Sequence, residues 1–386
     1  MNSVKHFVSV FAMLNALNTL AFEKVESVYL RNDSALIYCE IGITKNDDHD
    51  YINAISYFTK ALDLDSNLAS AYLNRALAER QLLDYKRAME DYNRMLRLKL
   101  NWEESYEVYF NKGLTQASLN NMKEAMADFN NAIKINPEFA DAYFNRSIVK
   151  GRLGDFQGEL CDINKVIQLS PGDATAFNSR GIVRSMEGNE EGAIDDFTRS
   201  IELDNANANA YFNRAVVQYD LRDYISALND YNSSIQLSPD AETYDRRANV
   251  KCRLKDYRGA FDDYNTALKN RPGNYMAYFN RGLLKMDLKD YKAAIVDFTI
   301  SIQLKPDYPE ALYNRGLANG KLNYHSEEIA DYTMAIHYQP NYENAYYQRG
   351  LARYGMDDKS GSCDDLNKAV HLGSDLAYSD LDKYCK

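Results

Sequence analysis

The sequence predicts an all-α solenoid of ten helix-turn-helix repeats followed by a C-terminal capping helix. Three observations support this prediction. The motif Ala-Tyr-Phe-Asn-Arg returns at 142–146, 210–214 and 277–281, and with Ala35 as position 1 a unit of 34 residues can be followed through 35–376. Position 8 is always small, and position 32 holds six of the seven prolines. Self-similarity at this period indicates stacked supersecondary units rather than one globular core.

Each repeat contains two stripes of recurring residues, at positions 4, 8 and 11 and at positions 20, 24 and 27. This i, i+4, i+7 spacing predicts one buried face on each of two helices. Position 4 is aromatic in nine repeats and position 24 in eight, so small residues at positions 8 and 20 let the helices approach while rings fill the remaining space. Asp or Asn at position 16 predicts the N-cap of the second helix, and proline at position 32 predicts its end. The repeats then cover 35–68, 69–102, 106–139, 140–173, 174–207, 208–240, 241–274, 275–308, 309–342 and 343–376.

The small residue at position 8, the Ala…Phe/Tyr…Ala spacing and the proline occur where the tetratricopeptide repeat (TPR) family has them. The chain resembles this family over residues 35–376, in particular a subgroup with Asn-Arg-Gly in the first helix. The resemblance implies a right-handed superhelical solenoid whose first helices line a concave surface, with 377–386 as the capping helix. One departure is regular: position 7 is basic in nine repeats, where the family usually has Leu.

Charged residues recur at positions 7 and 23. Position 23 is Asp in nine repeats, and both charges are missing together from the first repeat, which has Ile41 and Tyr57. We therefore expect positions 7 and 23 of one repeat to pair across its two helices. The alternative, pairing with position 7 of the next repeat, would leave Arg75 without a partner. The cations then serve the fold, and with a net charge of −11 and a pI near 5.1 the sequence argues against nucleic-acid binding.

The resemblance also implies a binding groove on the first helices, at positions 2, 5, 6, 9, 12 and 13. In this sequence position 5 supplies rings, position 6 supplies amides, and position 9 is aliphatic nearly throughout. The candidate groove residues are Phe110, Asn111, Phe144, Asn145, Phe212, Asn213, Phe279, Asn280, Tyr313, Asn314 and Tyr347. Rings beside amides suit an extended peptide, because the amides can bind its main chain. Packing between repeats explains rings at helical spacing equally well.

The charges of the groove bear on its partner. Position 2 is acidic in four repeats, which favours a neutral to basic protein or peptide. Family members that clamp a C-terminal carboxylate use Lys at position 5 and basic residues at position 6. No repeat here has Lys at position 5, and Arg246 is the only basic residue at position 6, so we do not expect this mode.

The sequence contains no pattern typical of catalysis. Its five histidines lie at no metal-ligand spacing, and HExxH, CxxC and glycine-rich phosphate motifs are missing. We therefore expect no enzymatic activity, no cofactor and no metal. The leading hypothesis is a protein–protein interaction scaffold that binds a peptide or protein segment in its concave groove. A substrate-presenting or regulatory subunit of an enzyme complex, and an architectural component of an envelope complex, remain alternatives.

The N-terminal residues leave two interpretations open. Residues 1–21 contain Lys5 and His6 followed by an apolar run over 7–17, which resembles a secretory signal peptide. The run is too short to span a membrane. The alternative is a capping helix that covers the first repeat, and residues 22–34 form a linker or a partial repeat in either case. The first interpretation implies a secreted or periplasmic protein, and the second a cytoplasmic one.

Two cysteines near the C-terminus bear on the same question. Cys363 and Cys385 each lie 11 residues from Ser374, and in an antiparallel helix pair this symmetry can bring them together. A disulfide would tie the capping helix to the last repeat and imply an oxidising compartment. Two unpaired thiols are the alternative. The other cysteines are expected to be small apolar core residues: Cys39, Cys161 and Cys252.

Overall fold

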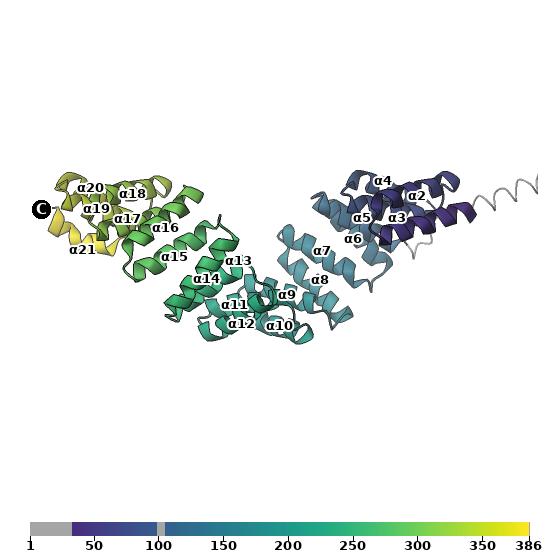
Figure 1. The fold of residues 1–386 in the computed structure, drawn as a ribbon, viewed down its shortest axis with the longest axis horizontal. Helices are drawn as coiled ribbons and strands as arrows, with labels where there is room; N and C mark the ends of the chain where they lie inside the picture. Colours follow the sequence, from purple (N-terminus) through teal and green to yellow (C-terminus); the bar gives the residue numbers. More distant parts are fainter. Residues whose placement is uncertain (1–32, 99–104, 386) are drawn as a thin grey trace, which may run out of the picture. The chain divides into compact units, whose positions relative to one another are not determined.

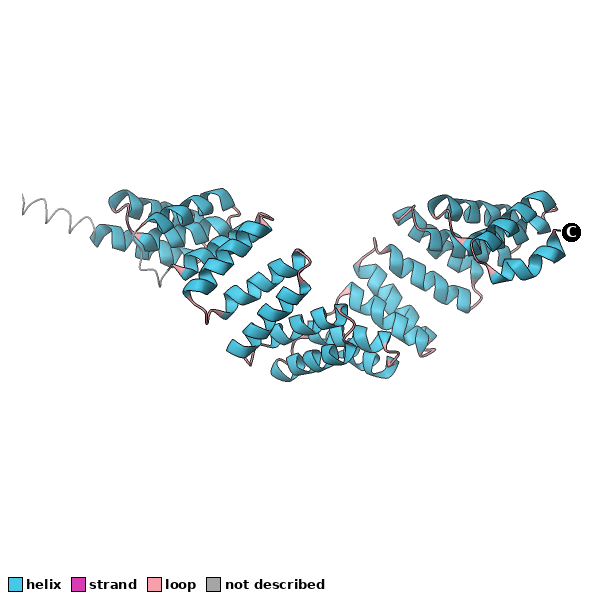
Figure 2. Cartoon of the chain, turned by 180° about the vertical axis from the view of Figure 1, so that it is seen from behind, coloured by secondary structure: helices cyan, strands magenta, loops and turns pink. Residues whose placement is uncertain are grey.

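The structure, a computed structural model, describes residues 33–98 and 105–385. Within these ranges the regular secondary structure is entirely α-helical, and Figure 2 shows helices joined by short loops without a strand. The predicted all-α class is therefore confirmed. The chain divides into two compact units, Met1–Val183 (unit 1) and Arg184–Lys386 (unit 2).

Consecutive helices form the pairs that the repeat predicts (Figure 1). In unit 1 a helix over residues 33–47 precedes α2 (Tyr51–Leu64), α3 (Ala69–Gln81), α4 (Tyr85–Arg97), α5 (Tyr106–Ser118), α6 (Met122–Ile135), α7 (Ala140–Arg152) and α8 (Phe156–Leu169). The unit boundary falls within α9 (Ala174–Met186).

Unit 2 continues the same alternation to the end of the described chain. Its helices are α10 (Glu190–Leu203), α11 (Ala208–Asp220), α12 (Tyr224–Leu237), α13 (Ala241–Arg253), α14 (Tyr257–Asn270), α15 (Tyr275–Asp287), α16 (Tyr291–Leu304), α17 (Pro309–Lys321), α18 (His325–Tyr338), α19 (Glu343–Gly355), α20 (Lys359–His371) and α21 (Asp375–Tyr384). The last of these is the capping helix.

The second helix of each repeat begins where its N-cap residue predicts. In eight repeats the side chain at position 16 accepts a hydrogen bond from a backbone N–H of the first turn, as Asp223 does from Ser226. Asn121 makes no such bond and instead donates its amide to Gln116, and the ninth repeat has Tyr324. The local sequence therefore sets the start of nearly every second helix.

The residue before this N-cap is left-handed in all ten repeats. At position 15, φ ranges from 60° at Asn323 to 81° at Gly154. Glycine is favoured in this conformation because it has no Cβ, yet only Gly154 and Gly188 are glycines here. Four others are Asn, Asp or His, which also favour positive φ, so the residue types at position 15 indicate the turn in six repeats of the ten.

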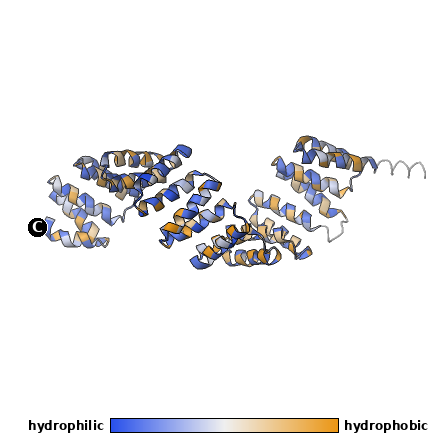
Figure 3. Ribbon diagram, turned by 60° about the horizontal axis from the view of Figure 1, so that its bottom comes forward, coloured by the Kyte–Doolittle hydropathy of each residue, from blue (hydrophilic) through white to orange (hydrophobic). Residues whose placement is uncertain are grey.

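The core consists of rings at position 24 packed onto the backbone at position 8. A Cβ added to Gly113 would lie 2.7 Å from the Phe129 ring, and one added to Gly282 would lie 2.7 Å from the Phe298 ring. Position 8 must therefore be small, as the sequence suggests. Hydrophobic and hydrophilic residues are interleaved around the helices, as expected when each helix buries one stripe (Figure 3).

The ion pair between positions 7 and 23 forms inside single repeats, which confirms the prediction. The Arg214 Nε and Nη2 atoms donate to the two carboxylate oxygens of Asp230 over 2.7 and 2.8 Å. The other described pairs are Arg75–Asp91, Lys112–Asp128, Arg146–Asp162, Arg247–Asp263, Arg281–Asp297, Arg315–Asp331 and Arg349–Asp365. These aspartates are at most 6% exposed, so the position 7 cations are committed to the fold.

Two further contacts enlarge this ion pair. Position 11 supplies a second cation to the same carboxylate in several repeats, as Lys285 does to Asp297 at 2.6 Å. The remaining guanidinium nitrogen donates to position 25 of the preceding repeat, as Arg214 Nη1 does to Thr198 Oγ1 at 2.9 Å. Each arginine therefore joins its own helix pair and ties it to the repeat before.

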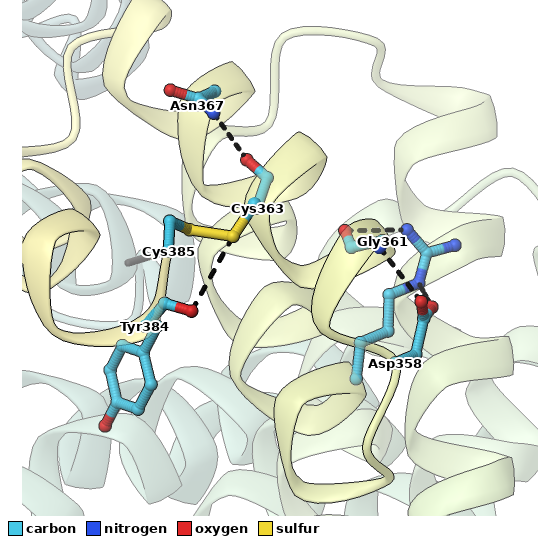
Figure 4. The surroundings of a disulfide bond; sticks show 7 residues. Asp358, Gly361, Cys363, Asn367, Tyr384 and Cys385 are labelled. Carbon is cyan, nitrogen blue, oxygen red and sulfur yellow. Dashed lines mark hydrogen bonds and ion pairs between the residues drawn. A yellow bond between two sulfur atoms is a disulfide. The ribbon is translucent and has the colours of Figure 1, made fainter.

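The capping helix is joined to the last repeat by a disulfide between Cys363 and Cys385, whose Cα atoms are 5.4 Å apart (Figure 4). Figure 4 shows Cys363 on α20 and Cys385 just after α21. The remaining cysteines are free: Cys39 is buried and Cys252 is half-buried, but Cys161 is exposed. The expectation that Cys161 is a core residue was wrong, because its helix position faces solvent.

Thiol counting tests this disulfide. The denatured, unreduced chain should titrate as three free thiols, and the count should rise to five after reduction. Reduction should also speed hydrogen exchange in α21, because the helix loses its covalent tie to α20. Five thiols before reduction would contradict the disulfide, and the Cys385→Ser variant should reproduce the exchange pattern of the reduced protein.

The N-terminal predictions, a signal peptide or capping helix over 1–21 and a linker or partial repeat over 22–34, fall outside the described residues except at 33 and 34, which are helical.

Candidate functional site

The first helices of successive repeats lie next to one another in both units. In unit 1 α3 contacts α5 and α5 contacts α7, and in unit 2 α13 contacts α15 and α15 contacts α17. Positions 6, 9, 12 and 13 of neighbouring first helices are therefore close together, and a pocket opens among them in each unit.

The pocket in unit 1, the repeat 2–4 pocket, has a volume of about 460 Å³. Its lining includes Leu114 and Ile148 at position 9, with Arg80 and Arg152 beside them. Ile148 is 40% exposed, so apolar surface is accessible there. Asn145 at position 6 adds an amide to the same wall.

The pocket in unit 2, the repeat 6–8 pocket, has a volume of about 440 Å³ and carries more charge. Position 13 of three successive repeats contributes Asp220, Arg253 and Asp287, whose signs alternate. Val216 and Leu283 supply the aliphatic position 9. The two pockets therefore share their place in the repeat but differ in charge, since the charged lining residues of the unit 1 pocket are all basic.

The candidate rings at position 5 are packed between helices. Phe110 lies 5.9 Å from the Phe129 ring at position 24 and 4.9 Å from the Phe139 ring at position 34, measured between centroids. Phe279 and Tyr313 make equivalent ring pairs, Phe212 packs on Tyr231, and Phe144 packs against a buried cluster. These rings are half-buried, and Tyr347 is buried with its hydroxyl donating to Asp380 over 2.8 Å. Packing between helices accounts for all six rings.

The amides at position 6 are half-buried and border the groove. Asn111, Asn145 and Asn314 each donate Nδ2 to the backbone carbonyl four residues earlier in their own helix, over 2.7 to 2.9 Å. One of the two N–H groups of each amide is thus engaged, and the Asn111 oxygen also accepts from Arg80 Nη1 over 3.4 Å. The second N–H group, and the amide oxygen of Asn145 and Asn314, are the groups these side chains can present to a ligand. Asn280 bonds the carboxyl of Asp245. Asn213 lies at the equivalent position of α11.

Repeat 7 departs from the groove pattern at three positions. It has Asp245 at position 5, Arg246 at position 6 and Asn249 at position 9, where other repeats mostly have a ring, an amide and an aliphatic residue. Asp245 is only 8% exposed, and burial raises the pKa of its carboxyl to about 6. Tyr264 donates its hydroxyl to Asn249 Oδ1 over 2.8 Å. All three departures are visible in the sequence when the repeats are aligned, although the prediction of the groove considered only Arg246.

Two glutamates at position 20 replace the usual alanine. Glu328 is buried and contacts His325 Nδ1 at 3.0 Å and the Tyr332 hydroxyl at 3.4 Å, while burial raises the pKa of half-buried Glu159. Their repeats have Gly320 and Gly151 at position 12, where a Cβ would clash with the carboxylate. Glycine at position 12 thus makes room for the larger side chain.

The described residues contain neither a candidate metal site nor a candidate membrane-spanning helix. There, three or more His, Cys, Asp or Glu side chains nowhere gather in a way that could hold a metal ion. None of the described helices has the length and apolar character needed to cross a membrane.

Comparison with known proteins supports the repeat assignment. Models of the tetratricopeptide repeat match residues 106–139 and 246–309, and no curated protein matches the chain. The APC/C hetero-tetramer Cut9-Hcn1 aligns with a TM-score of 0.51 at 14% identity, covering 92% of this chain and 85% of that one. A tetratricopeptide repeat protein from Parabacteroides merdae ATCC 43184 aligns with a TM-score of 0.50 at 19% identity, covering 66% and 97%.

A further similar structure is YrrB, a TPR protein with an unusual peptide-binding site, with a TM-score of 0.41, 22% identity and coverage of 48% and 94%. At these identities the Cut9-Hcn1 and Parabacteroides structures show the fold alone. The fold they share, the two model matches and the helix pairs at the repeat period identify this chain as a tetratricopeptide repeat protein.

Proposed function

We propose that the chain is a non-catalytic scaffold that binds an extended segment of a partner protein along the groove of its first helices. Tetratricopeptide repeats generally mediate protein–protein interactions, which supports a binding role. The observation that carries the proposal is the recurrence of a pocket at positions 6, 9, 12 and 13 in both units.

The groove offers complementary chemistry to a peptide. Aliphatic residues at position 9 supply apolar contact, and the amides at position 6 can bind a main chain through their oxygen and their second N–H group, since one N–H is already engaged. The rings at position 5 pack against rings of the second helices, and so hold the first helices in place. Exposed acidic residues at position 2 favour a neutral to basic segment: Glu107, Asp141, Glu242 and Glu310.

Groove binding can be tested with peptides selected on the intact chain from a random display library. A variant combining Ile148→Asp and Asp287→Lys alters one lining residue of each pocket. It should weaken the selected peptides by about tenfold or more, or about 1.4 kcal/mol, because apolar contact and charge complementarity are lost.

The matched control combines Ile52→Asp and Asp262→Lys, which change exposed residues of the second helices α2 and α14. The control should bind like the natural chain, with helicity by circular dichroism unchanged in both variants. Equal weakening by both variants, or by neither, would place the binding surface elsewhere.

A further inference from the structure

Repeat 7 contains a cavity where three other repeats have two rings. Positions 5 and 34 hold a pair of rings in repeats 3, 8 and 9, at 4.9 Å for Phe110–Phe139 and 5.0 Å for Phe279–Tyr308. In repeat 7 these positions are Asp245 and Asn274. Both line a cavity of about 290 Å³ between α13 and α15. The two smaller polar side chains therefore leave open the space that the rings fill elsewhere.

The carboxylate in this cavity lacks a full set of hydrogen bonds. Asp245 is 8% exposed, and its Oδ1 atom has no partner among the described residues, although Asn280 bonds the carboxyl group. A buried carboxylate oxygen without a donor is unfavourable, because no hydrogen bond replaces those it made to water in the unfolded chain. A repeat that keeps such a group instead of a ring gives up stability at this position, and a bound donor would recover it.

The surrounding charges indicate what kind of donor fits. Glu242 and Arg246 on α13 pair with each other at 3.5 Å, and Arg271 before α15 is exposed. Of the four charged residues that line the cavity, only Asp245 is buried. The charge of Arg246 is partly neutralised by Glu242. Tyr275 and Met276 add carbon surface beside the carboxylate. A long apolar stem that ends in a cation matches this combination.

We propose that the repeat 7 cavity is a specificity pocket that receives a lysine or arginine side chain from the bound protein segment, with Asp245 as its counter-ion. This proposal rests on the proposed function in one respect, namely that the lysine or arginine belongs to a protein segment bound along the groove. The ammonium or guanidinium group would donate to the Asp245 carboxylate where it lines the cavity, while the stem lies against Tyr275 and Met276. The pocket would thereby select for a basic residue at one point of the segment.

Small probes test the pocket without the natural partner. N-acetyl-lysine methylamide is titrated into the full-length chain, with the norleucine analogue as a neutral probe of similar stem and the glutamate analogue as an anion. Binding is followed by the NMR shift of the Asp245 carboxyl carbon. The lysine probe should give a saturable shift and bind about tenfold more tightly than norleucine, since only the cation compensates the carboxylate.

Variants complete the test through the NMR shift of the Met276 methyl group, which lines the cavity. Asp245→Asn keeps the shape of the side chain and should remove the preference for lysine over norleucine, whereas Asp262→Asn on the exposed face of α14 should keep it. No saturable shift with lysine, tighter binding of glutamate, or an unchanged preference in Asp245→Asn would each overturn the proposal. None of these results would bear on the binding test with the Ile148→Asp and Asp287→Lys variant. Failure of the pocket proposal can therefore be distinguished from failure of groove binding.

Discussion

Replacing Asp297 by alanine should destabilise unit 2 by about 3–5 kcal/mol, because it removes one partner of a buried ion pair. Asp297 is 0% exposed, and it accepts two hydrogen bonds from Arg281 at 2.9 and 2.7 Å. Lys285 lies 2.6 Å from the same carboxylate. Alanine would leave two largely buried cations without their counter-ion, and that desolvation cost is the main source of the expected loss.

Urea unfolding followed by hydrogen exchange in α15 and α16 measures this effect locally, which matters because repeat proteins do not always unfold as one unit. Asp262→Ala on the exposed face of α14 is the control and should change stability by less than about 0.5 kcal/mol. Replacing the whole cluster, with Arg281→Met, Lys285→Met and Asp297→Leu together, should recover most of the loss because no charge remains unpaired. A loss below about 1 kcal/mol in Asp297→Ala would mean that the cluster contributes little.

The sequence predicts the repeat architecture well because the same physical constraints recur ten times. The ion pair between positions 7 and 23 is visible because Ile41 and Tyr57 replace both charges in one repeat. Position 11, which supplies the second cation, carries a weaker signal: it is basic in six repeats, and Lys45 is present in the first repeat although the aspartate is missing there. The left-handed turn at position 15 left a partial signal, since six of its ten residues are Gly, Asn, Asp or His, which favour this conformation. At the other four, such as Leu83 and Arg222, the tertiary packing of the two helices, and not the local residue type, sets the backbone.

The groove was harder to predict for a geometric reason. A ring at position 5 has the spacing of a groove residue, but whether it faces a ligand or a neighbouring helix depends on what fills positions 24 and 34. Phe279 meets rings at both, so it is packed, whereas Asp245 meets Tyr264 and Asn274 and borders a cavity. Three positions from two helices and the following loop must be compared before the cavity can be recognised.

Repeat 2 carries an acidic residue where other repeats carry the second cation. Glu79 occupies position 11, is 4% exposed, and has an Oε2 atom without a hydrogen-bond partner among the described residues. Burial, and after it the charge of nearby Asp91, raises the pKa of Glu79 from 4.5 to about 7. Two carboxylates therefore compete for Arg75, and the ionised form of Glu79 weakens unit 1.

The sign of the resulting pH dependence follows from linkage. The folded-state pKa is raised, so the contribution of Glu79 to stability is fully present below about pH 4.5 and is lost as the pH rises through about 7. Glu79→Lys would place an ammonium group beside Asp91, as Lys150 does beside Asp162 at 2.8 Å. We expect this variant to stabilise unit 1 by about 2–3 kcal/mol at pH 8 and by clearly less at pH 5, where the native glutamate is protonated.

Urea unfolding at both pH values, followed by hydrogen exchange in α3 and α4, distinguishes this effect from a general change in charge. Glu79→Gln should show the same trend with a smaller gain, because it removes the repulsion without adding a cation. Glu90→Gln removes an equal charge from an exposed position on α4. This control should show the same pH dependence of stability as the natural chain. Parallel stability curves for Glu79→Gln and the natural chain would show that Glu79 is ionised at little cost, and that Arg75 serves both carboxylates.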